Sequence, residues 1–275
     1  MTVIEVLKAA SGHLTKQRSS SARLDSELLL AQTLGIKRLD LYLQFDRPLS
    51  DDELGRFREL IRRRGHGEPV AYLVGHKEFM ALEFEVTPAV LVPNPDTELL
   101  VQRAVAIARQ SDSPLRVADV GTGSGCIAIA LAHYAPRVEV WASDVSEPAL
   151  EVAGRNVARH GLGERVHLVC GDLVAPLPGE LDLICANLPY LAAGLTLPAE
   201  VTAQPRDALF AAGDGAGLVV RLLEAAPAKL GPGGRVLAEL DPAIVETVSA
   251  AASRGFANVN VHRDLGGHER MLEAW

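Results

Sequence analysis

The sequence predicts an α/β fold, a doubly wound, seven-stranded, mostly parallel sheet that follows a small N-terminal helical domain and a β-hairpin linker. Apolar runs alternate with helical stretches through the C-terminal part of the chain, which is typical of a parallel sheet covered on both faces. The N-terminal part instead repeats apolar side chains at helical spacing, as Val3, Val6 and Ala10 do. Between the two parts, from about Glu68 to Val92, the period falls to two, which predicts a β-hairpin.

Composition narrows the possible classes of function. The chain has 275 residues and 48% hydrophobic content, enough for one large and one small folded domain. A net charge of −8 weighs against wrapping a phosphate backbone, so we expect no direct nucleic-acid binding. The eight histidines lack paired ligand spacing, and no metal site is expected. No apolar run approaches a membrane span, so we expect a cytoplasmic protein without a membrane partner.

The three cysteines, Cys126, Cys170 and Cys185, lie in apolar segments and show no Cys-x-x-Cys spacing. We expect all three to be reduced residues of the core.

The expected domain boundaries are residues 1–67 for the helical bundle, 68–92 for the linker and 93–275 for the α/β domain. Within the bundle, Ser50-Asp-Asp-Glu53 has the pattern of a capping box and predicts the start of a third helix. The cations Arg62-Arg63-Arg64 suit the end of that helix. Partner binding is an alternative interpretation of the same run.

Seven strands are predicted in the α/β domain, with helical stretches between the first six. Gly266-Gly267 separates the last two strands by too little chain for a crossover, so the last strand is expected to be antiparallel. The expected ranges are Leu115–Val120, Val138–Asp144, Val166–Asp172, Leu181–Leu188, Gly234–Leu240, Phe256–Asp264 and Glu269–Trp275.

A glycine-rich loop follows the first of these strands. It comprises Asp119, Gly121, Thr122, Gly123, Ser124 and Gly125, and precedes a helix expected from Cys126. Glycines let the backbone approach a ligand closely, and the helix start offers N–H groups. The third glycine comes one residue too early for the dinucleotide fingerprint, which disfavours NAD.

Acidic residues end the next two strands. Asp144 lies where a carboxylate can accept both ribose hydroxyls of an adenosine, whereas Ser146 suits the cap of the following helix. Asp172 could accept an adenine amino group, although a turn aspartate in Gly171-Asp172-Leu173 is an alternative. Polar groups at four successive strand ends predict one cofactor site.

The fourth strand ends in Asn187-Leu188-Pro189-Tyr190, which delivers an amide and an aromatic ring to the same edge of the sheet. By itself the tetrapeptide is also compatible with a simple proline turn. The neighbouring strand ends favour a site.

Taken together, these residues resemble the class I S-adenosylmethionine-dependent methyltransferases, in which Asn187–Tyr190 corresponds to the Asn-Pro-Pro-Tyr motif of nitrogen-methylating enzymes. The linker, with Glu68-Pro-Val-Ala-Tyr72 and Val90–Leu100, resembles the HemK/PrmC-type release-factor glutamine methyltransferases. This resemblance implies a Rossmann-like fold, S-adenosyl-L-methionine as cofactor, and peptide chain release factors as protein substrates. The expected reaction is methylation of the side-chain amide nitrogen (N5) of the glutamine in their Gly-Gly-Gln loop.

The resemblance also implies roles for particular residues. The side chain of Asn187 and the main-chain carbonyl of Leu188 would hold the substrate amide, with Pro189 and Tyr190 as an apolar wall. The glycine loop, Asp144, Asp172, Leu173 and Asn187 would bind the cofactor, and the helical domain would recognise the substrate. Three residues depart from the family pattern, namely Leu188, Asn94 and Asp241. Because Leu188 would act through its carbonyl, its side chain is expected to be free to vary.

Two alternatives stay open from the sequence. The first is a nucleic-acid N-methyltransferase that acts on adenine or guanine amino groups. The second is a non-catalytic scaffold that keeps a methyltransferase-like fold, since fold alone does not fix function.

Overall fold

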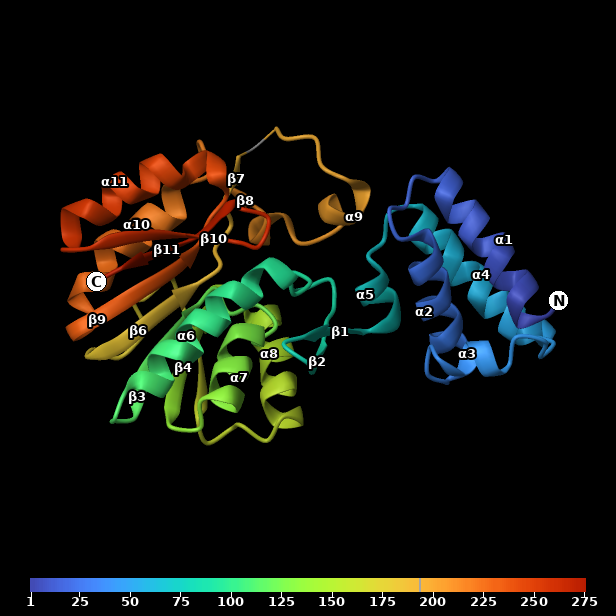
Figure 1. Cartoon of the computed structure of the whole chain (residues 1–275), viewed down its shortest axis with the longest axis horizontal. Helices are drawn as coiled ribbons and strands as arrows, with labels where there is room; N and C mark the ends of the chain where they lie inside the picture. Colours follow the sequence, from blue (N-terminus) through green and yellow to red (C-terminus); the bar gives the residue numbers. More distant parts are fainter. Residues whose placement is uncertain (193) are drawn as a thin grey trace. The chain divides into compact units, whose positions relative to one another are not determined.

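The computed structural model describes residues 1–192 and 194–275, which form two compact units. The first unit comprises Met1–His76 together with Leu197–Ala203, and the second comprises Lys77–Thr196 together with Gln204–Trp275 (Figure 1). Among the described residues, no helix is both long enough and apolar enough to cross a membrane.

The first unit is helical. Its third long helix begins with the predicted capping box, because Ser50 Oγ accepts from Glu53 N (3.2 Å) and Glu53 Oε2 accepts from Ser50 N (2.9 Å). Two short helices in this unit were not predicted, one before the capping box and one after the arginine run. The helices are α1 (Val3–Lys16), α2 (Ala22–Leu34), α3 (Asp40–Leu43), α4 (Asp51–Gly65) and α5 (Val70–Val74), with α9 (Ala199–Thr202) from the later segment.

The arginine run at the end of α4 makes ion pairs within this unit. Arg62 pairs with Glu59 and Arg63 with Glu68. The Arg64 guanidinium is buried and lies 2.7 Å from Asp25 of α2, each side chain being 5% exposed. Arg64 also pairs with Glu200 of α9. The run therefore lies in the last turn of α4, as the helix-termination interpretation expects, and it also ties the helices of the unit together.

The predicted hairpin is present but shorter than expected. Its strands are β1 (His76–Phe79) and β2 (Leu82–Glu85), joined at Met80 and Ala81, which adopt φ of +51° and +57°. The helix α5 occupies the first part of the expected hairpin segment. It follows Pro69 and ends at Gly75, whose φ of +82° suits a left-handed helix cap.

The second unit is built on a seven-stranded sheet in the order β10-β11-β9-β6-β3-β4-β5. All neighbouring pairs are parallel except those of β11, which runs antiparallel to both β9 and β10, as predicted. The strands are β3 (Leu115–Val120), β4 (Val138–Asp144), β5 (Val166–Cys170), β6 (Leu181–Ala186), β9 (Leu230–Glu239), β10 (Val259–Arg263) and β11 (Glu269–Ala274). The doubly wound fold class is confirmed.

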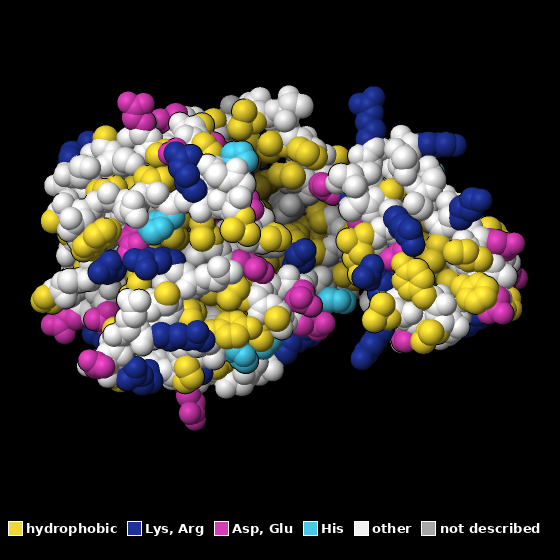
Figure 2. Space-filling model, in the orientation of Figure 1, with side chains coloured by type: hydrophobic (Ala, Val, Ile, Leu, Met, Phe, Trp, Pro, Cys, Tyr) yellow, Lys and Arg dark blue, Asp and Glu magenta, His cyan; other side chains and the backbone are white. Residues whose placement is uncertain are grey.

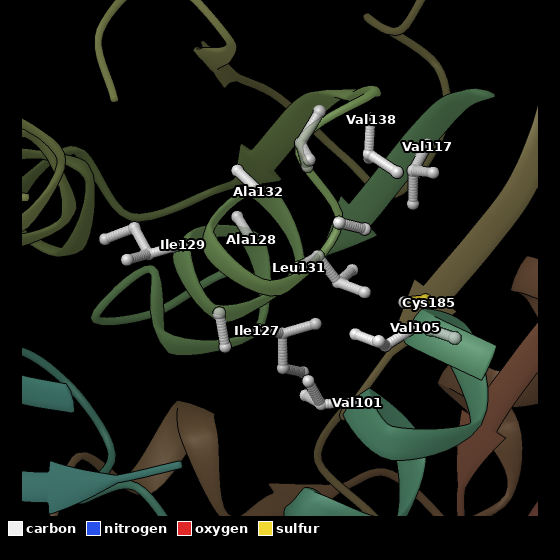
Figure 3. Close-up of a cluster of buried hydrophobic side chains, with 14 of the residues drawn as sticks. Val101, Val105, Val117, Ile127, Ala128, Ile129, Leu131, Ala132, Val138 and Cys185 are labelled. Atoms are coloured by element: carbon white, nitrogen blue, oxygen red, sulfur yellow. The ribbon is translucent and has the colours of Figure 1, made fainter. Parts of the chain in front are cut away.

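Helices cover both faces of this sheet. Successive residues of a strand point to opposite faces, so each strand contributes side chains to two buried clusters. Val117 joins one buried cluster and Ala118 the other. The first cluster includes side chains of α6 (Glu98–Gln110), α7 (Cys126–Tyr134) and α8 (Glu147–Arg159). Figure 3 shows its α6 and α7 side chains together with Val117 and Cys185 of the sheet. The second packs against α10 (Gly217–Ala225) and α11 (Val245–Gly255).

A buried carboxylate joins the antiparallel edge of the sheet to α6. Glu273 of β11 is 1% exposed and accepts hydrogen bonds from Arg103 (2.8 Å), Arg235 (2.7 Å) and His262 (2.8 Å). Burial opposes its charge, but the three donors outweigh burial and lower the pKa of Glu273 to about 2.

Two expectations for this unit were wrong, and one pair of strands was not predicted. Residues 171–180 form turns rather than a helix between β5 and β6, because Pro176, Pro178 and Gly179 interrupt that segment. Cys170 is exposed rather than in the core, since it ends the edge strand β5. A two-stranded parallel pair, β7 (Leu191–Ala192) with β8 (Phe210–Ala211), was not predicted.

Four 3₁₀ turns occur among the described residues of the second unit. They are η1 (Pro95–Thr97), η2 (Arg206–Ala208), η3 (Ala226–Ala228) and η4 (Pro242–Ile244).

Candidate active site

A cavity of about 480 Å³ opens at the carboxyl ends of the parallel strands. The sheet order reverses between β3 and β6, and such a switch point is where open α/β sheets bind ligands. Most of the predicted site residues line this cavity, namely Gly121, Thr122, Gly123, Ser124, Asp144, Asp172, Leu173, Asn187, Leu188 and Pro189. No metal-binding group of His, Cys, Asp or Glu occurs among the described residues.

The glycine loop is fixed by its neighbour strand. The N–H groups of Gly121 and Thr122 donate to the Ser143 carbonyl of β4 at 2.8 and 2.9 Å. Gly121 and Gly123 have φ of +75° and +54°, which L side chains rarely adopt. A Cβ added at Gly123 would meet nothing within 4 Å, so the backbone there borders open space.

Asp119 holds this loop by hydrogen bonds from the buried side of the sheet edge. It is fully buried, and its Oδ2 accepts from Thr122 Oγ1 (2.6 Å) and from Ala128 N (3.1 Å) at the start of α7. Burial raises the pKa of Asp119 to about 7, and the charge of Asp144 adds to the effect. The structure thus places Asp119 behind the cavity lining rather than in it.

Asp144 ends β4 at the rim of the cavity. Its Oδ2 accepts from Gly123 N and its Oδ1 from Ser146 N, both at 2.9 Å. Ser146 Oγ caps α8 by accepting from Ala149 N (3.3 Å), as the sequence suggested. Each carboxylate oxygen accepts one of these bonds and has a further lone pair for a ligand hydroxyl.

Asp172 and Leu173 follow β5. The Asp172 carboxylate is half-exposed and forms an ion pair with Arg221 of α10. Leu173 has φ of +49°, and its carbonyl accepts from Ser143 Oγ (2.9 Å). Ser143, which sequence inspection did not single out, therefore holds two of the loops that line the cavity.

The tetrapeptide after β6 is divided between the cavity and the core. Asn187 Nδ2 donates to Thr97 Oγ1 (2.9 Å), and both residues line the cavity. The Tyr190 ring packs on the second buried cluster, and its hydroxyl donates to Glu239 Oε1 (3.3 Å). Burial raises the pKa of Tyr190 above its ordinary value, as does the neighbouring Glu239.

The expectation that the Leu188 side chain is free to vary was wrong. Leu188 is 5% exposed and belongs to the second buried cluster. A Cβ added to Gly121 would lie only 2.9 Å from Leu188 Cδ2, so this side chain covers the glycine loop. The signal was present in the sequence, because Leu188 is the apolar last residue of the predicted buried strand.

The other two departures from the family pattern are caps. Asn94 begins η1, where its side chain accepts from Asp96 N (3.2 Å). Asp241 begins η4 and accepts from Ala243 N (2.9 Å), with a φ of −85° that requires no glycine. Both substitutions therefore have a local structural role.

Comparison with solved structures shows the fold. A methyltransferase from Pyrococcus furiosus superposes with a TM-score of 0.55 at 21% identity, covering 72% of this chain and 90% of that one. The 16S rRNA N2 G1207 methyltransferase of T. thermophilus, solved with AdoMet and guanosine, gives a TM-score of 0.53 at 17% identity, covering 72% and 49%.

Comparison of sequences shows the family. Residues 5–75 match the model of the PrmC N-terminal domain, and residues 95–214 match that of the methyltransferase small domain. The release factor glutamine methyltransferase of Rhodopirellula baltica is 41% identical, covering 98% of this chain and 95% of its own. That of Moorella thermoacetica is 40% identical, covering 100% and 99%. The chain therefore belongs to the release factor glutamine methyltransferase family.

Proposed function

We propose that this chain transfers a methyl group from S-adenosyl-L-methionine to the side-chain amide nitrogen of glutamine in the Gly-Gly-Gln loop of peptide chain release factors. The observation that carries the proposal is the position of Asn187, which lies in one cavity with the glycine loop. Membership of the family supplies the substrate class. The cavity contains the residues that would bind the cofactor and position the substrate amide.

The cavity residues fit the cofactor. S-adenosyl-L-methionine carries an electrophilic methyl group on a sulfonium and an adenosine with two ribose hydroxyls. Asp144 at the cavity rim would accept from those hydroxyls, and the open backbone at Gly123 leaves room beside it. Asp172 and Leu173 would flank the adenine, and the loop Gly121–Gly125 would approach the remainder of the cofactor.

Catalysis by this chain would rest on positioning. An amide nitrogen is a weak nucleophile, because its lone pair is delocalised into the carbonyl. Asn187 Oδ1 and the Leu188 carbonyl would accept the two N–H bonds of the substrate amide and aim its nitrogen at the methyl group. Pro189 would cover the flat face of the amide and exclude water.

The helical unit would recognise the rest of the release factor. It exposes large hydrophobic side chains around α3, including Leu39 (69% exposed), Leu43 (79%) and Phe45 (55%). Figure 2 shows such side chains gathered on this unit among lysines and arginines. Exposed apolar side chains of this size are typical of protein-binding surfaces. We therefore assign substrate recognition to residues 1–67.

The deciding experiment is transfer of labelled methyl groups to a purified release factor. Methylation is expected with the natural loop and not with a loop whose glutamine is changed to alanine. Asn187→Ala is expected to lower transfer about 100- to 1,000-fold, because an oriented acceptor is lost. Its cofactor affinity in calorimetry should stay within about threefold, since the ribose contacts are kept.

The matched control is Asn258→Ala, which changes an exposed asparagine in the same unit. This variant is expected to keep full activity. Full activity of Asn187→Ala would instead remove the clamp from the mechanism. Methylation of DNA or ribosomal RNA, with no transfer to the release factor, would establish the nucleic-acid alternative.

A further inference from the structure

Four polar side chains form a connected row beside the cavity. Asn187 Nδ2 donates to Thr97 Oγ1 at 2.9 Å. The Thr97 hydroxyl lies near the Glu239 carboxyl and lowers its pKa, as a hydrogen-bond donor does. Tyr190 donates its hydroxyl to the same carboxylate at 3.3 Å. Thr97 and Glu239 are each only 2% exposed, so water does not compete for these bonds.

The position of Thr97 is suited to this row. Thr97 is the N-cap residue of α6, yet its hydroxyl turns to Asn187 and Glu239 instead of capping that helix. Glu239 ends β9, the strand that pairs with β6 and therefore lies beside Asn187. The sheet register thus brings the carboxylate behind the hydroxyl, and the hydroxyl behind the amide.

Hydrogen-bond chemistry gives the row one direction. An ionised carboxylate only accepts, and Thr97 lowers the pKa of Glu239, so the Thr97 hydroxyl directs its single proton to that carboxylate. The Thr97 oxygen then has only lone pairs for Asn187, which must present its NH₂ group. The carbonyl oxygen of Asn187 is consequently turned the other way, toward the cavity that both residues line.

We infer that Thr97 is a positioning residue, held by Glu239, that fixes the orientation in which Asn187 accepts from the substrate amide. This inference rests on the proposed function and deepens it, because the opposite orientation would point an NH₂ group at another NH₂ group. Such a contact repels the substrate instead of holding it. Free rotation of the Asn187 amide would therefore lower the rate of transfer.

Protonation of Glu239 reverses the row. A protonated carboxyl donates to Thr97, which can then donate to the oxygen of Asn187. Burial raises the pKa of Glu239 to about 7, and Glu239 Oε2 has no hydrogen-bond partner among the described residues. The ionisable groups that act on this carboxyl are Asp96, Tyr190, Arg270 of β11 and Cys126 of α7. Asp241 acts on the neighbouring Tyr190. Asp96 raises the pKa of Glu239 further and Arg270 lowers it.

The kinetic test compares Thr97→Val, which keeps the shape and removes the hydroxyl, with Thr97→Ser, which keeps the hydroxyl. Thr97→Val is expected to lower kcat about 10- to 100-fold, while the affinity for S-adenosyl-L-methionine changes less than about threefold. Thr97→Ser should stay within about threefold of the unchanged enzyme. A Thr97→Val enzyme with unchanged kcat would overturn the inference.

A matched control repeats the chemical change away from the cavity. Thr247→Val replaces an exposed threonine of α11 in the same unit, which does not line the cavity. It is expected to leave kcat and its pH profile unchanged. In the unchanged enzyme, kcat should rise as pH increases through about 7, the pKa of Glu239. Glu239→Gln should flatten that rise, whereas an unaltered profile in Glu239→Gln would count against the row.

A second readout needs no release factor. In protein labelled with ¹⁵N asparagine, the Asn187 side-chain amide protons are identified by their loss in Asn187→Ala. They should exchange slowly with solvent and shift with a midpoint near pH 7, and Thr97→Val should abolish both effects. Identical exchange in the two proteins would refute the inference. If the release factor is not methylated, the proposed function fails while this measurement still decides the orientation of Asn187.

Discussion

Truncation of Leu188 to alanine tests whether the tetrapeptide is held in place by its buried side chain. Burial to 5% exposure and contact with the glycine loop make Leu188 part of the core of the second unit. Leucine-to-alanine changes in cores cost about 2–5 kcal/mol in unfolding free energy. Because Leu188 also borders the cavity, where water can fill the space left behind, we expect about 2–3 kcal/mol.

The assay is urea unfolding followed by tryptophan fluorescence. Both tryptophans of the chain, Trp141 and Trp275, lie in the second unit, so their signal reports this unit alone. Leu265→Ala is the matched control, because Leu265 is fully exposed in the turn between β10 and β11. That control should change the unfolding free energy by less than about 0.5 kcal/mol.

The same variant separates the side chain of Leu188 from its carbonyl. The carbonyl remains in Leu188→Ala but is held less firmly, so methyl transfer should fall about tenfold rather than the larger factor expected for Asn187→Ala. Leu188→Ile keeps the buried volume and should cost less than about 1.5 kcal/mol. If Leu188→Ala unfolds at the same urea concentration as the unchanged protein, the assignment of Leu188 to the core is wrong.

Three further predictions concern the cofactor and the two ionic clusters. Asp144→Ala should weaken S-adenosyl-L-methionine binding about tenfold or more in calorimetry, because two acceptors for hydroxyls are lost; unchanged affinity would remove Asp144 from the site. Asp25→Ala should lower the unfolding temperature and reduce the free energy of unfolding by about 3–5 kcal/mol, since it leaves Arg64 charged and without its buried carboxylate. Thermal unfolding followed by circular dichroism measures this change, and an unchanged melting curve would contradict it. The lowered pKa of Glu273 should add about 3 kcal/mol to the free energy of unfolding above pH 4.5, and this contribution should be lost as pH falls from about 4.5 to about 2. Glu273→Gln should remove this acid dependence in denaturant titrations. If the dependence is retained, other groups cause it.

The sheet was largely predictable because its strands are buried on both faces. The ranges predicted for β3 and β4 match the structure at both ends, since each is a mainly apolar, valine-containing stretch. By contrast, β9 begins at Leu230 and passes through Pro232-Gly233, which sequence patterns assign to a turn. Pairing of Leu230 with Leu181 of β6 extends the strand there, and this tertiary contact leaves no mark in the local sequence.

The site was predictable where chemistry is local and not where it depends on the register of the sheet. The glycine loop and Asn187 are recognisable because each lies directly after an apolar strand. Thr97 and Glu239 are far from Asn187 along the chain. Pairing of β9 with β6 brings Glu239 close, and packing of α6 against these strands brings Thr97 close. The burial of Asp119 behind the loop was missed for the same reason, because its position depends on the packing of α7.

Selection of protein over nucleic acid must come from outside the tetrapeptide. Asn187 and the Leu188 carbonyl would hold any planar nitrogen with two hydrogens, and adenine and guanine amino groups share this feature with glutamine. A nucleic acid would also bring phosphates to the mouth of the cavity, where cations would have to meet them. Among the described residues that line the cavity, three are aspartates and none is lysine or arginine. This rim repels a polyanion but accepts an uncharged Gly-Gly-Gln loop, so the electrostatics of the cavity favour the same substrate as the family does.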